Sequence, residues 1–268
     1  MPNKFDILVI DDEQVIIDSI LKVASIDNYS VDYVTFGKLG LEKIIKGKYK
    51  LIICDVMLPD INGFQILEYL EKNALNIPII ITTGYSTIDN AIKALTHGAI
   101  DYLSKPFTFE ELESCISRGM KFSEIIKNLK KCSNSDSQLM HHFTPCPANY
   151  LRFGFSTWVN PEKEGLYKCG ILDLYLKTIG QIEKVSMPPV GSSILQGQEF
   201  MQITDEFGYL HKVFAPISGK IILCNEKIDI NINLIEKDPY FDGWLALILP
   251  DSLLNDKKNL VSCSSDRY

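Results

Sequence analysis

The first half of this 268-residue chain alternates five times between a short apolar run and a segment with helical apolar spacing. The helical spacing is clearest in residues 88–95, where Ile88, Ala91, Ile92 and Leu95 fall on one helix face. Strands that alternate with helices form a parallel sheet covered on both faces. We therefore predict a doubly wound α/β domain. Its expected strands are 5–10, 31–35, 51–54, 77–81 and 101–104, and its expected helices are 16–24, 39–45, 64–70, 88–95 and 112–122.

Polar residues stand where these expected strands end. Two carboxylates, Asp11 and Asp12, follow the first strand, and Asp55 follows the third. Thr83 follows the fourth strand, and Lys105 follows the fifth. In an open α/β sheet, ligands bind beyond the carboxyl ends of the strands. We therefore expect these five side chains to meet at one edge of the sheet.

The three carboxylates indicate a magnesium site for phosphoryl transfer. Crowded carboxylates repel one another unless a cation lies among them, and Mg²⁺ prefers oxygen ligands in octahedral geometry. The expected ligands are Asp12, Asp55 and the backbone carbonyl of Met57, while Asp11 holds waters of the same metal site. A cation placed there cancels the repulsion between a carboxylate and an incoming phosphoryl group, so that one carboxylate can be phosphorylated.

Two further side chains suit the charge of a phosphoryl group. Lys105 is expected to pair with one phosphoryl oxygen and Thr83 to donate its hydroxyl to another, while Gly84 lets the backbone come close. Pro106 suggests a cis peptide bond that fixes where the Lys105 ammonium points. Each residue alone has an ordinary explanation, such as a helix cap for Asp12 or a turn for the Lys-Pro pair. Their joint placement at the strand ends favours the site.

These segments resemble the receiver domain of bacterial response regulators over residues 4–122. The resemblance implies a flavodoxin-like sheet with strand order 2-1-3-4-5. It also implies that Asp55 accepts a phosphoryl group from a phosphohistidine of a sensor histidine kinase. The protein is then no enzyme but a phosphoacceptor, with at most self-catalysed phosphoryl transfer and dephosphorylation. The matching segments are 7–13, 55–63, 83–85 and 101–107.

The same resemblance implies a conformational switch. The Thr83 hydroxyl moves toward the phosphate and Tyr102 turns inward, which alters the face made by the fourth helix and the fifth strand. Taken alone, Tyr102 is typical of half-buried packing. Weak helical spacing continues beyond Phe122 to Leu129, and this extension could carry a signal or a homodimer contact of the receiver.

The composition changes after the α/β pattern. Residues 130–147 are rich in Ser, Asn, Asp, His and Pro, which is typical of a linker. Beyond them, glycines and prolines punctuate short segments with β character, which indicates an all-β barrel or sandwich. The predicted boundaries are a receiver at 1–129, a linker at 130–147, a β domain at 148–255 and a tail at 256–268.

The β domain resembles the glycine-cleavage H protein, a lipoyl-carrying β fold, over residues 150–250. Its most specific parts are 238–240 and 243–244, which read Asp-Pro-Tyr and Gly-Trp. Such carriers present one lysine at the tip of a β-hairpin, where its amine is lipoylated. Here the tip falls on Phe207 or Gly208, so we expect no lipoate. The nearest lysine, Lys212, lies in a segment with strand alternation, and its lipoylation is the alternative.

The charge and composition exclude several classes of partner. A net charge of −7 and a pI near 5.2 argue against a nucleic-acid-binding surface. No apolar stretch approaches the roughly 20 residues that span a bilayer, so we expect a cytoplasmic protein without a membrane partner. Seven cysteines without a Cys-x-x-Cys pair indicate reduced thiols. His141, His142 and Cys146 have no matching fourth ligand for a metal.

The sequence as a whole predicts a two-component response regulator. Its output is a non-DNA-binding, H-protein-like module with an unknown protein partner. Two alternatives stay open, namely a lipoyl carrier that regulates a metabolic complex, and a transcriptional regulator.

Overall fold

The structure, a computed structural model, describes residues 5–132 and 143–265. The chain divides into two compact units, Met1–Glu124 and Ile125–Tyr268, and each is described by itself. Most of the predicted linker, 130–147, lies outside the described residues. No helix among those described is long and apolar enough to span a bilayer.

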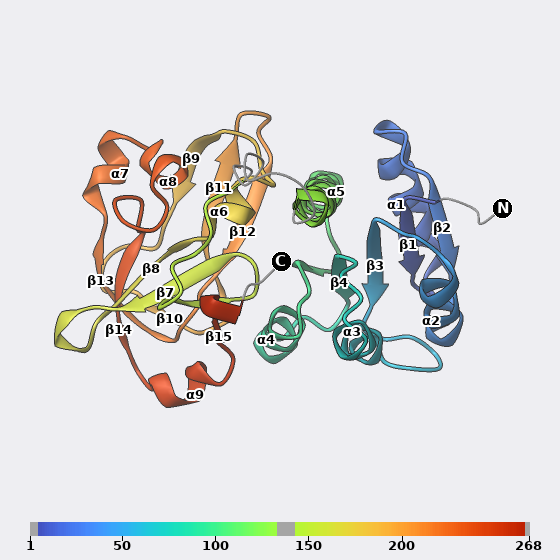
Figure 1. Ribbon diagram of the computed structural model, residues 1–268, viewed down its shortest axis with the longest axis horizontal. Helices are drawn as coiled ribbons and strands as arrows, with labels where there is room; N and C mark the ends of the chain where they lie inside the picture. Colours follow the sequence, from blue (N-terminus) through green and yellow to red (C-terminus); the bar gives the residue numbers. More distant parts are fainter. Residues whose placement is uncertain (1–4, 133–142, 266–268) are drawn as a thin grey trace. The chain divides into compact units, whose positions relative to one another are not determined.

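The first unit is built on a five-stranded parallel sheet with strand order β2-β1-β3-β4-β5 (Figure 1). This order confirms the prediction. The fourth strand is displaced by two residues from its predicted position, which makes Thr83 the last residue of the strand. The strands are β1 (Ile7–Ile10), β2 (Val31–Val34), β3 (Leu51–Asp55), β4 (Ile79–Thr83) and β5 (Asp101–Ser104).

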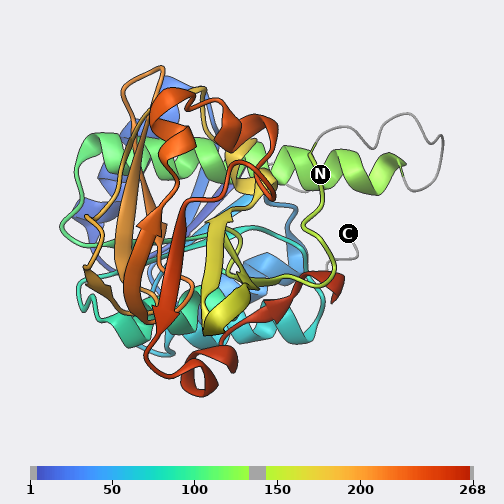
Figure 2. The same ribbon diagram turned by 90° about the vertical axis from the view of Figure 1, so that its left-hand side faces the viewer.

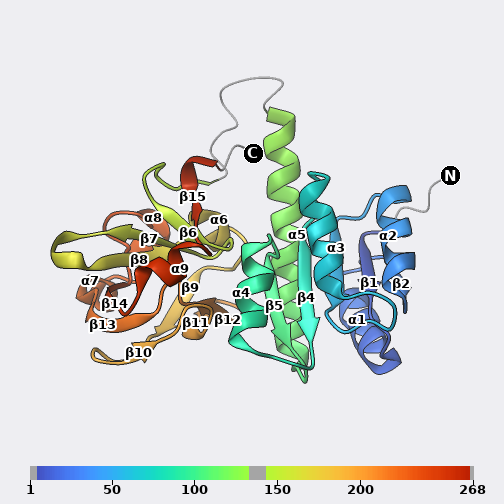
Figure 3. The ribbon, with the colours of Figure 1, turned by 90° about the horizontal axis from the view of Figure 1, so that it is seen from below.

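Helices cover both faces of this sheet, so its inner strands are buried on both sides. Helices α1 and α5 pack on one face, where they form a core with Ile7, Val9 and Leu51. Helices α2, α3 and α4 lie on the other face (Figures 1 and 3). The last helix continues past residue 122 to Cys132, and it includes the weak helical spacing that the sequence shows as far as Leu129. The helices are α1 (Gln14–Ile26), α2 (Gly37–Lys46), α3 (Gly63–Lys72), α4 (Ile88–Thr96) and α5 (Phe109–Cys132).

The second unit is an antiparallel β fold, as predicted (Figure 2). Seven strands form one sheet in the order β10-β13-β14-β8-β7-β6-β15, and β12-β11-β9 form another. A core of aromatic and aliphatic side chains, with Trp158 fully buried, fills this unit. The strands are β6 (Leu151–Phe153), β7 (Thr157–Pro161), β8 (Tyr167–Ile171), β9 (Ile182–Ser186), β10 (Ser193–Ile194), β11 (Glu199–Asp205), β12 (Leu210–Phe214), β13 (Gly219–Cys224), β14 (Ala246–Pro250) and β15 (Val261–Ser262).

Short helical elements join these strands, and the sequence analysis did not predict them. They are η1 (Lys163–Gly165), α6 (Asp173–Leu176), α7 (Glu226–Ile230), α8 (Leu234–Lys237), α9 (Leu253–Lys257) and η2 (Cys263–Ser265).

The predicted tail, 256–268, contributes to this fold through its described residues, 256–265. Strand β15 pairs with β6 through Val261 and Arg152. Asp256 is buried, and its Oδ2 accepts a hydrogen bond from the Ser218 N–H at 2.6 Å. These contacts tie the end of the described chain to the sheet.

Candidate functional site

Three carboxylates meet at the carboxyl ends of β1 and β3. Asp11 and Asp12 follow β1 directly, and Asp55 is the last residue of β3. One oxygen from each lies within 4.8 Å of the others. Asp11 and Asp55 are buried while Asp12 is exposed, so the cluster opens to solvent on one side.

The Lys105 ammonium lies beside this cluster. Its Nζ is 2.9 Å from Asp11 Oδ2 and 3.5 Å from Asp55 Oδ1. The Lys105 side chain is only 7% exposed, and its peptide bond to Pro106 is cis, as the sequence suggests. Glu13 Oε1 also lies 2.8 Å from Nζ. This role of Glu13 was not predicted, because a charged residue just before a helix carries no signal of a long-range ion pair.

Burial and mutual repulsion perturb the acid–base behaviour of these groups. Burial, together with the nearby Asp11 charge, raises the pKa of Asp55 to about 6, although Lys105 opposes the shift. Burial likewise raises the pKa of Asp11. Burial alone would lower the pKa of Lys105, but its hydrogen bonds to Glu13 and Asp11 raise it instead. Lys105 therefore stays charged, whereas burial disfavours the charged forms of Asp11 and Asp55.

The residues of the cluster fit a divalent cation. Asp55 Oδ1 is buried and accepts no hydrogen bond from any residue that the structure describes, although the Lys105 ammonium lies 3.5 Å away. A buried carboxylate oxygen without a hydrogen bond is costly, and a second cation would offset that cost. Three carboxylates against one ammonium leave excess negative charge, and hard oxygen donors are what Mg²⁺ prefers. Asp11, Asp12 and Asp55 are thus the side chains that would hold the ion.

The loop after β3 carries Met57, the remaining expected ligand. An antiparallel bridge between Met57 and Asn62 closes this loop. Asn62 also caps α3, because its Oδ1 accepts the Phe64 N–H at 2.9 Å. At Gly63 an added Cβ would come 2.2 Å from the Asp55 carbonyl oxygen. The close approach requires glycine there, and it fixes the loop against the backbone of Asp55.

The two expected switch residues lie on neighbouring strands. Thr83 is fully buried at the end of β4, and its Oγ1 accepts the Tyr85 N–H at 3.1 Å. The Thr83 carbonyl accepts the Lys105 N–H at 2.7 Å, which joins the ends of β4 and β5. Tyr102 on β5 is 6% exposed, and burial raises the pKa of its phenol. Its ring therefore lies inward in this structure.

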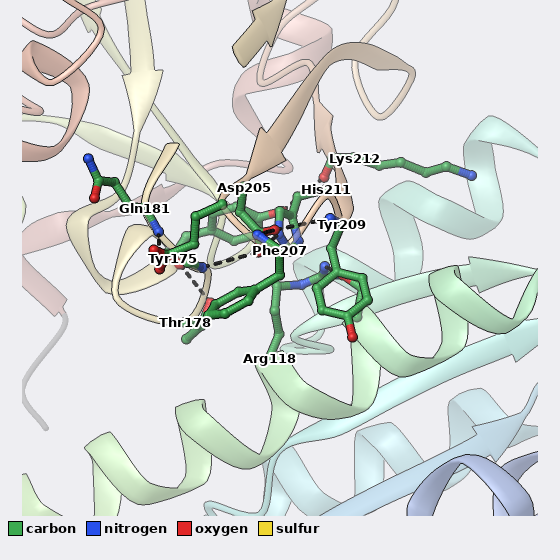
Figure 4. Close-up of polar contacts among 12 residues, drawn as sticks. Arg118, Tyr175, Thr178, Gln181, Asp205, Phe207, Tyr209, His211 and Lys212 are labelled. Carbon is green, nitrogen blue, oxygen red and sulfur yellow. Dashed lines mark hydrogen bonds and ion pairs between the residues drawn. The ribbon is translucent and has the colours of Figure 1, made fainter. Parts of the chain in front are cut away.

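A β-hairpin of the second unit lies where the lipoyl carriers present their lysine, the position expected to hold Phe207 or Gly208 in this chain. Strands β11 and β12 form it, and residues 206–209 make its turn (Figure 4). Gly208 has a φ of +82°, as expected for a turn glycine, and Phe207 is 67% exposed. Lys212 lies within β12 opposite Gln202, away from the tip. The structure thus confirms that the Lys212 segment is a strand.

A buried acid closes this turn. Asp205 Oδ1 accepts the N–H groups of Phe207 and Tyr209, each at 3.0 Å. Its Oδ2 lies 2.9 Å from His211 Nε2 and accepts the Gly180 N–H at 3.3 Å (Figure 4). Asp205 and His211 are each 2% exposed. The sequence analysis missed this pair, because alternation along a strand does not reveal which polar residue turns inward.

Of the remaining candidates from the sequence, two lie in the second unit and two lie outside the described residues. Tyr240 belongs to the core of the second unit, and its ring lies 6.1 Å from that of Trp158 between centroids. Trp244 packs at the edge, where Lys168 Nζ lies 5.5 Å from its ring centroid. His141 and His142 lie outside the described residues.

Comparisons with known families divide the chain in the same way as its fold. Residues 7–117 match the family model described as response regulator receiver domain. Residues 151–267 match the model described as glycine cleavage H-protein.

Individual relatives match one part of the chain at a time. Response regulator ArlR of Staphylococcus saprophyticus is 42% identical over 123 residues, which are 46% of this chain and 55% of ArlR. Transcriptional regulatory protein HprR of Escherichia coli is 41% identical over 106 residues, covering 40% of this chain and 47% of HprR. The chain thus spans about half the length of these curated relatives. A crystal structure of a glycine cleavage system H protein from Mycobacterium marinum is 22% identical, with a TM-score of 0.37, over 40% of this chain and 87% of that one.

Proposed function

Because the chain joins a response regulator receiver domain to a glycine cleavage H-protein domain, we propose that it is a two-component response regulator with an H-protein-like output module. Asp55 is the phosphoacceptor, and a sensor histidine kinase is the phosphodonor. The observation that carries the proposal is the gathering of Asp11, Asp12, Asp55 and Lys105 at one edge of the sheet. Uptake of one phosphoryl group by the wild type and none by Asp55→Asn tests it.

The side chains of the site divide the work of phosphoryl transfer. An Asp55 oxygen attacks the phosphorus of the phosphohistidine, the P–N bond breaks, and the imidazole leaves. Lys105 pairs with a phosphoryl oxygen. Its positive charge offsets the negative charge that is spread over the oxygens of the transferring group. A bound Mg²⁺ supplies positive charge that offsets the repulsion between carboxylate and phosphate. Asp11, Asp12 and Asp55, together with the Met57 carbonyl, would hold the ion.

Phosphorylation then changes the surface next to the site. Thr83 gives up its contact with the Tyr85 N–H and donates its hydroxyl to the phosphate. Tyr102, which lies within β5, is held inward, and the face made by α4 and β5 changes. Phosphorylation thus biases the receiver between two states of different surface. A protein partner, the second unit or a second receiver then binds one of the two surfaces in preference to the other.

The second unit acts as an interaction module without lipoate or DNA. Its hairpin tip carries Phe207 and Gly208, which have no amine for lipoylation. The names of relatives such as HprR refer to transcriptional regulation. Those relatives match this chain over the receiver, and residues 151–267 match the H-protein model instead. The unit therefore serves a protein partner that has yet to be identified.

Magnesium binding should reverse the pH dependence of receiver stability. Without metal, the raised pKa of Asp55 means that the folded state binds more protons than the unfolded state between pH about 4 and 6. Receiver stability therefore rises as the pH falls through this window. Magnesium needs the charged carboxylates, so below pH about 6 its apparent affinity falls by up to about tenfold per pH unit. Calorimetric unfolding of the full chain, with and without millimolar Mg²⁺ across this range, measures both trends.

The variant Asp55→Asn distinguishes the contribution of Asp55 to the pH dependence of stability from that of the other acidic residues. It removes one titrating group, so its metal-free stability should rise less toward acid pH than that of the wild type, and only the contribution of Asp11 should remain. The exposed residue Asp18 offers a matched control, because Asp18→Asn should behave as the wild type. An unchanged melting temperature in Mg²⁺ at pH about 7.5 would argue against a metal site here.

The wild-type protein should resist lipoylation. Incubation with lipoate, ATP and a lipoate ligase should leave its intact mass unchanged, because no lysine lies at the hairpin tip. Lys212 is held in β12, with Nζ 3.8 Å from Glu199 Oε2. The variant Phe207→Lys places an amine at the tip. Its lipoylation would mean that only the lysine is missing from this domain, whereas an unchanged mass would mean that the surface recognised by the ligase is missing too. A lipoyl adduct on wild-type Lys212 would favour the carrier function instead.

A further inference from the structure

Two thiols at opposite ends of the second unit meet in space. Cys146 Sγ lies 2.8 Å from Cys263 Sγ, although 117 positions separate the two residues in sequence. Both are thiols in this structure. A disulfide has an S–S length of about 2.05 Å, so the two sulfurs need to approach by less than about 1 Å to bond. From this geometry we infer that Cys146 and Cys263 are a reversible disulfide site.

The surrounding backbone holds the two cysteines in place. The Cys263 N–H donates to the Tyr150 carbonyl at 3.1 Å, directly beside the pairing of β15 with β6. On the Cys146 side, the Tyr240 hydroxyl donates to the Thr144 carbonyl at 2.9 Å. The segment that carries Cys146 is therefore anchored on both sides of the thiol. Such a preorganised pair loses little further freedom when the bond forms.

The local space and exposure suit thiol–disulfide exchange. A small cavity of about 30 Å³ adjoins both sulfurs and leaves room for them to shift. Cys263 is 5% exposed whereas Cys146 is partly exposed, so an incoming reagent meets Cys146 first. No third histidine, cysteine or carboxylate among the described residues completes a metal site around them. The pair therefore fits oxidation better than metal binding.

The oxidant is a low-molecular-weight disulfide such as glutathione disulfide. The Cys146 thiolate attacks one of its sulfurs, the S–S bond breaks, and one glutathione leaves with the proton from Cys146. The Cys263 sulfur then attacks Cys146 Sγ of the mixed disulfide, and the second glutathione leaves with the proton from Cys263. Two thiols and one disulfide thus become one protein disulfide and two glutathiones. A dithiol reductant reverses both steps.

The bond would join the segment that enters the second unit to its last strand. It closes a long loop, and long loops give the larger disulfide stabilisation. Oxidation should raise the melting temperature of this unit by about 5 to 10 °C. Both tryptophans, Trp158 and Trp244, lie in the second unit, so tryptophan fluorescence follows its unfolding alone.

Peptide mapping after oxidation tests the inference. The full chain is equilibrated with glutathione disulfide, its remaining thiols are blocked, and it is digested with trypsin. A linkage between peptides 132–152 and 259–267 is expected, together with the melting shift, and dithiothreitol should reverse both. Peptide 132–152 also contains Cys132. The control Cys132→Ser should therefore keep the linkage, while Cys146→Ser and Cys263→Ser should lose it.

Two results would overturn the inference. One is a wild-type digest without the linked peptides at a large excess of glutathione disulfide. The other is a linkage that persists in Cys146→Ser but disappears in Cys132→Ser, because Cys132 would then be the partner.

Discussion

Asp55→Asn should abolish phosphorylation of the full chain by a small phosphodonor in the presence of magnesium. The amide has neither the charge nor the nucleophilicity of the carboxylate, and the remaining side chains cannot replace it. The substitution preserves the shape of the side chain, so the buried end of β3 should stay folded. Incorporation of radiolabel from a phosphoramidate or acetyl phosphate measures the effect, and the expected result is a complete loss.

The control for this prediction is Asp18→Asn on α1. Asp18 is exposed, and its Oδ1 accepts a hydrogen bond from Gln14 within the same helix at 2.7 Å. Its replacement should leave labelling at the wild-type level. Equal labelling of Asp55→Asn and the wild type would place the phosphoryl group elsewhere and remove the proposed role of Asp55.

Asp205→Ala should destabilise the second unit by about 3 kcal/mol or more. The carboxylate accepts three backbone N–H groups and faces His211, so its removal leaves His211 buried without this partner and the three N–H groups without their acceptor. Leaving a buried hydrogen-bonding group without its partner costs about 1 to 3 kcal/mol, and Asp205 has several such partners. Urea unfolding followed by tryptophan fluorescence measures the loss, because both tryptophans report on this unit.

Two comparisons make this prediction specific. Glu206 is the exposed neighbour in the same turn, and Glu206→Ala should change the unfolding free energy by no more than about 0.5 kcal/mol. Burial alone would raise the pKa of Asp205, but hydrogen bonds from His211 and from backbone N–H groups lower it overall. A lowered carboxylate pKa gives stability that is present above pH about 4 and lost as the pH falls through the folded-state pKa. Wild-type stability should thus fall in this acidic range, and Asp205→Ala should lack that part of the fall.

Much of the first unit could be predicted because its signals are local. Runs such as 51–54 are apolar throughout, since helices bury both faces of a parallel strand. The site residues follow from position alone, because Asp11 directly follows its strand while Asp55 and Thr83 are the last residues of theirs, and these strand ends share one edge of the sheet. The fourth strand was displaced by two residues, since the apolar run from Ile77 begins before the paired segment does. Apolar character marks burial, whereas pairing sets the strand bounds.

Contacts between residues that are distant in sequence were not predictable in the same way. The ion pair of Glu13 with Lys105 joins positions 92 apart, and the residues next to either one carry no sequence signal of it. The contact of Cys146 with Cys263, 117 positions apart, follows from the path of the chain in space. The segment from 256 onward has the composition of a tail, yet Asp256 and β15 are held by partners from other strands. Its place in the fold depends on tertiary contacts that a single sequence does not show.

Chemical mapping of the phosphorylated residue tests the central claim most directly. The full chain is phosphorylated with a small phosphodonor and magnesium, and the acyl phosphate is reduced with borohydride, which converts the modified aspartate to homoserine. Peptide sequencing by mass spectrometry should then place homoserine at position 55, and hydroxylamine should release the phosphate from an unreduced sample. A phosphate that withstands hydroxylamine, or homoserine at position 11 or 12 in place of 55, would contradict the account.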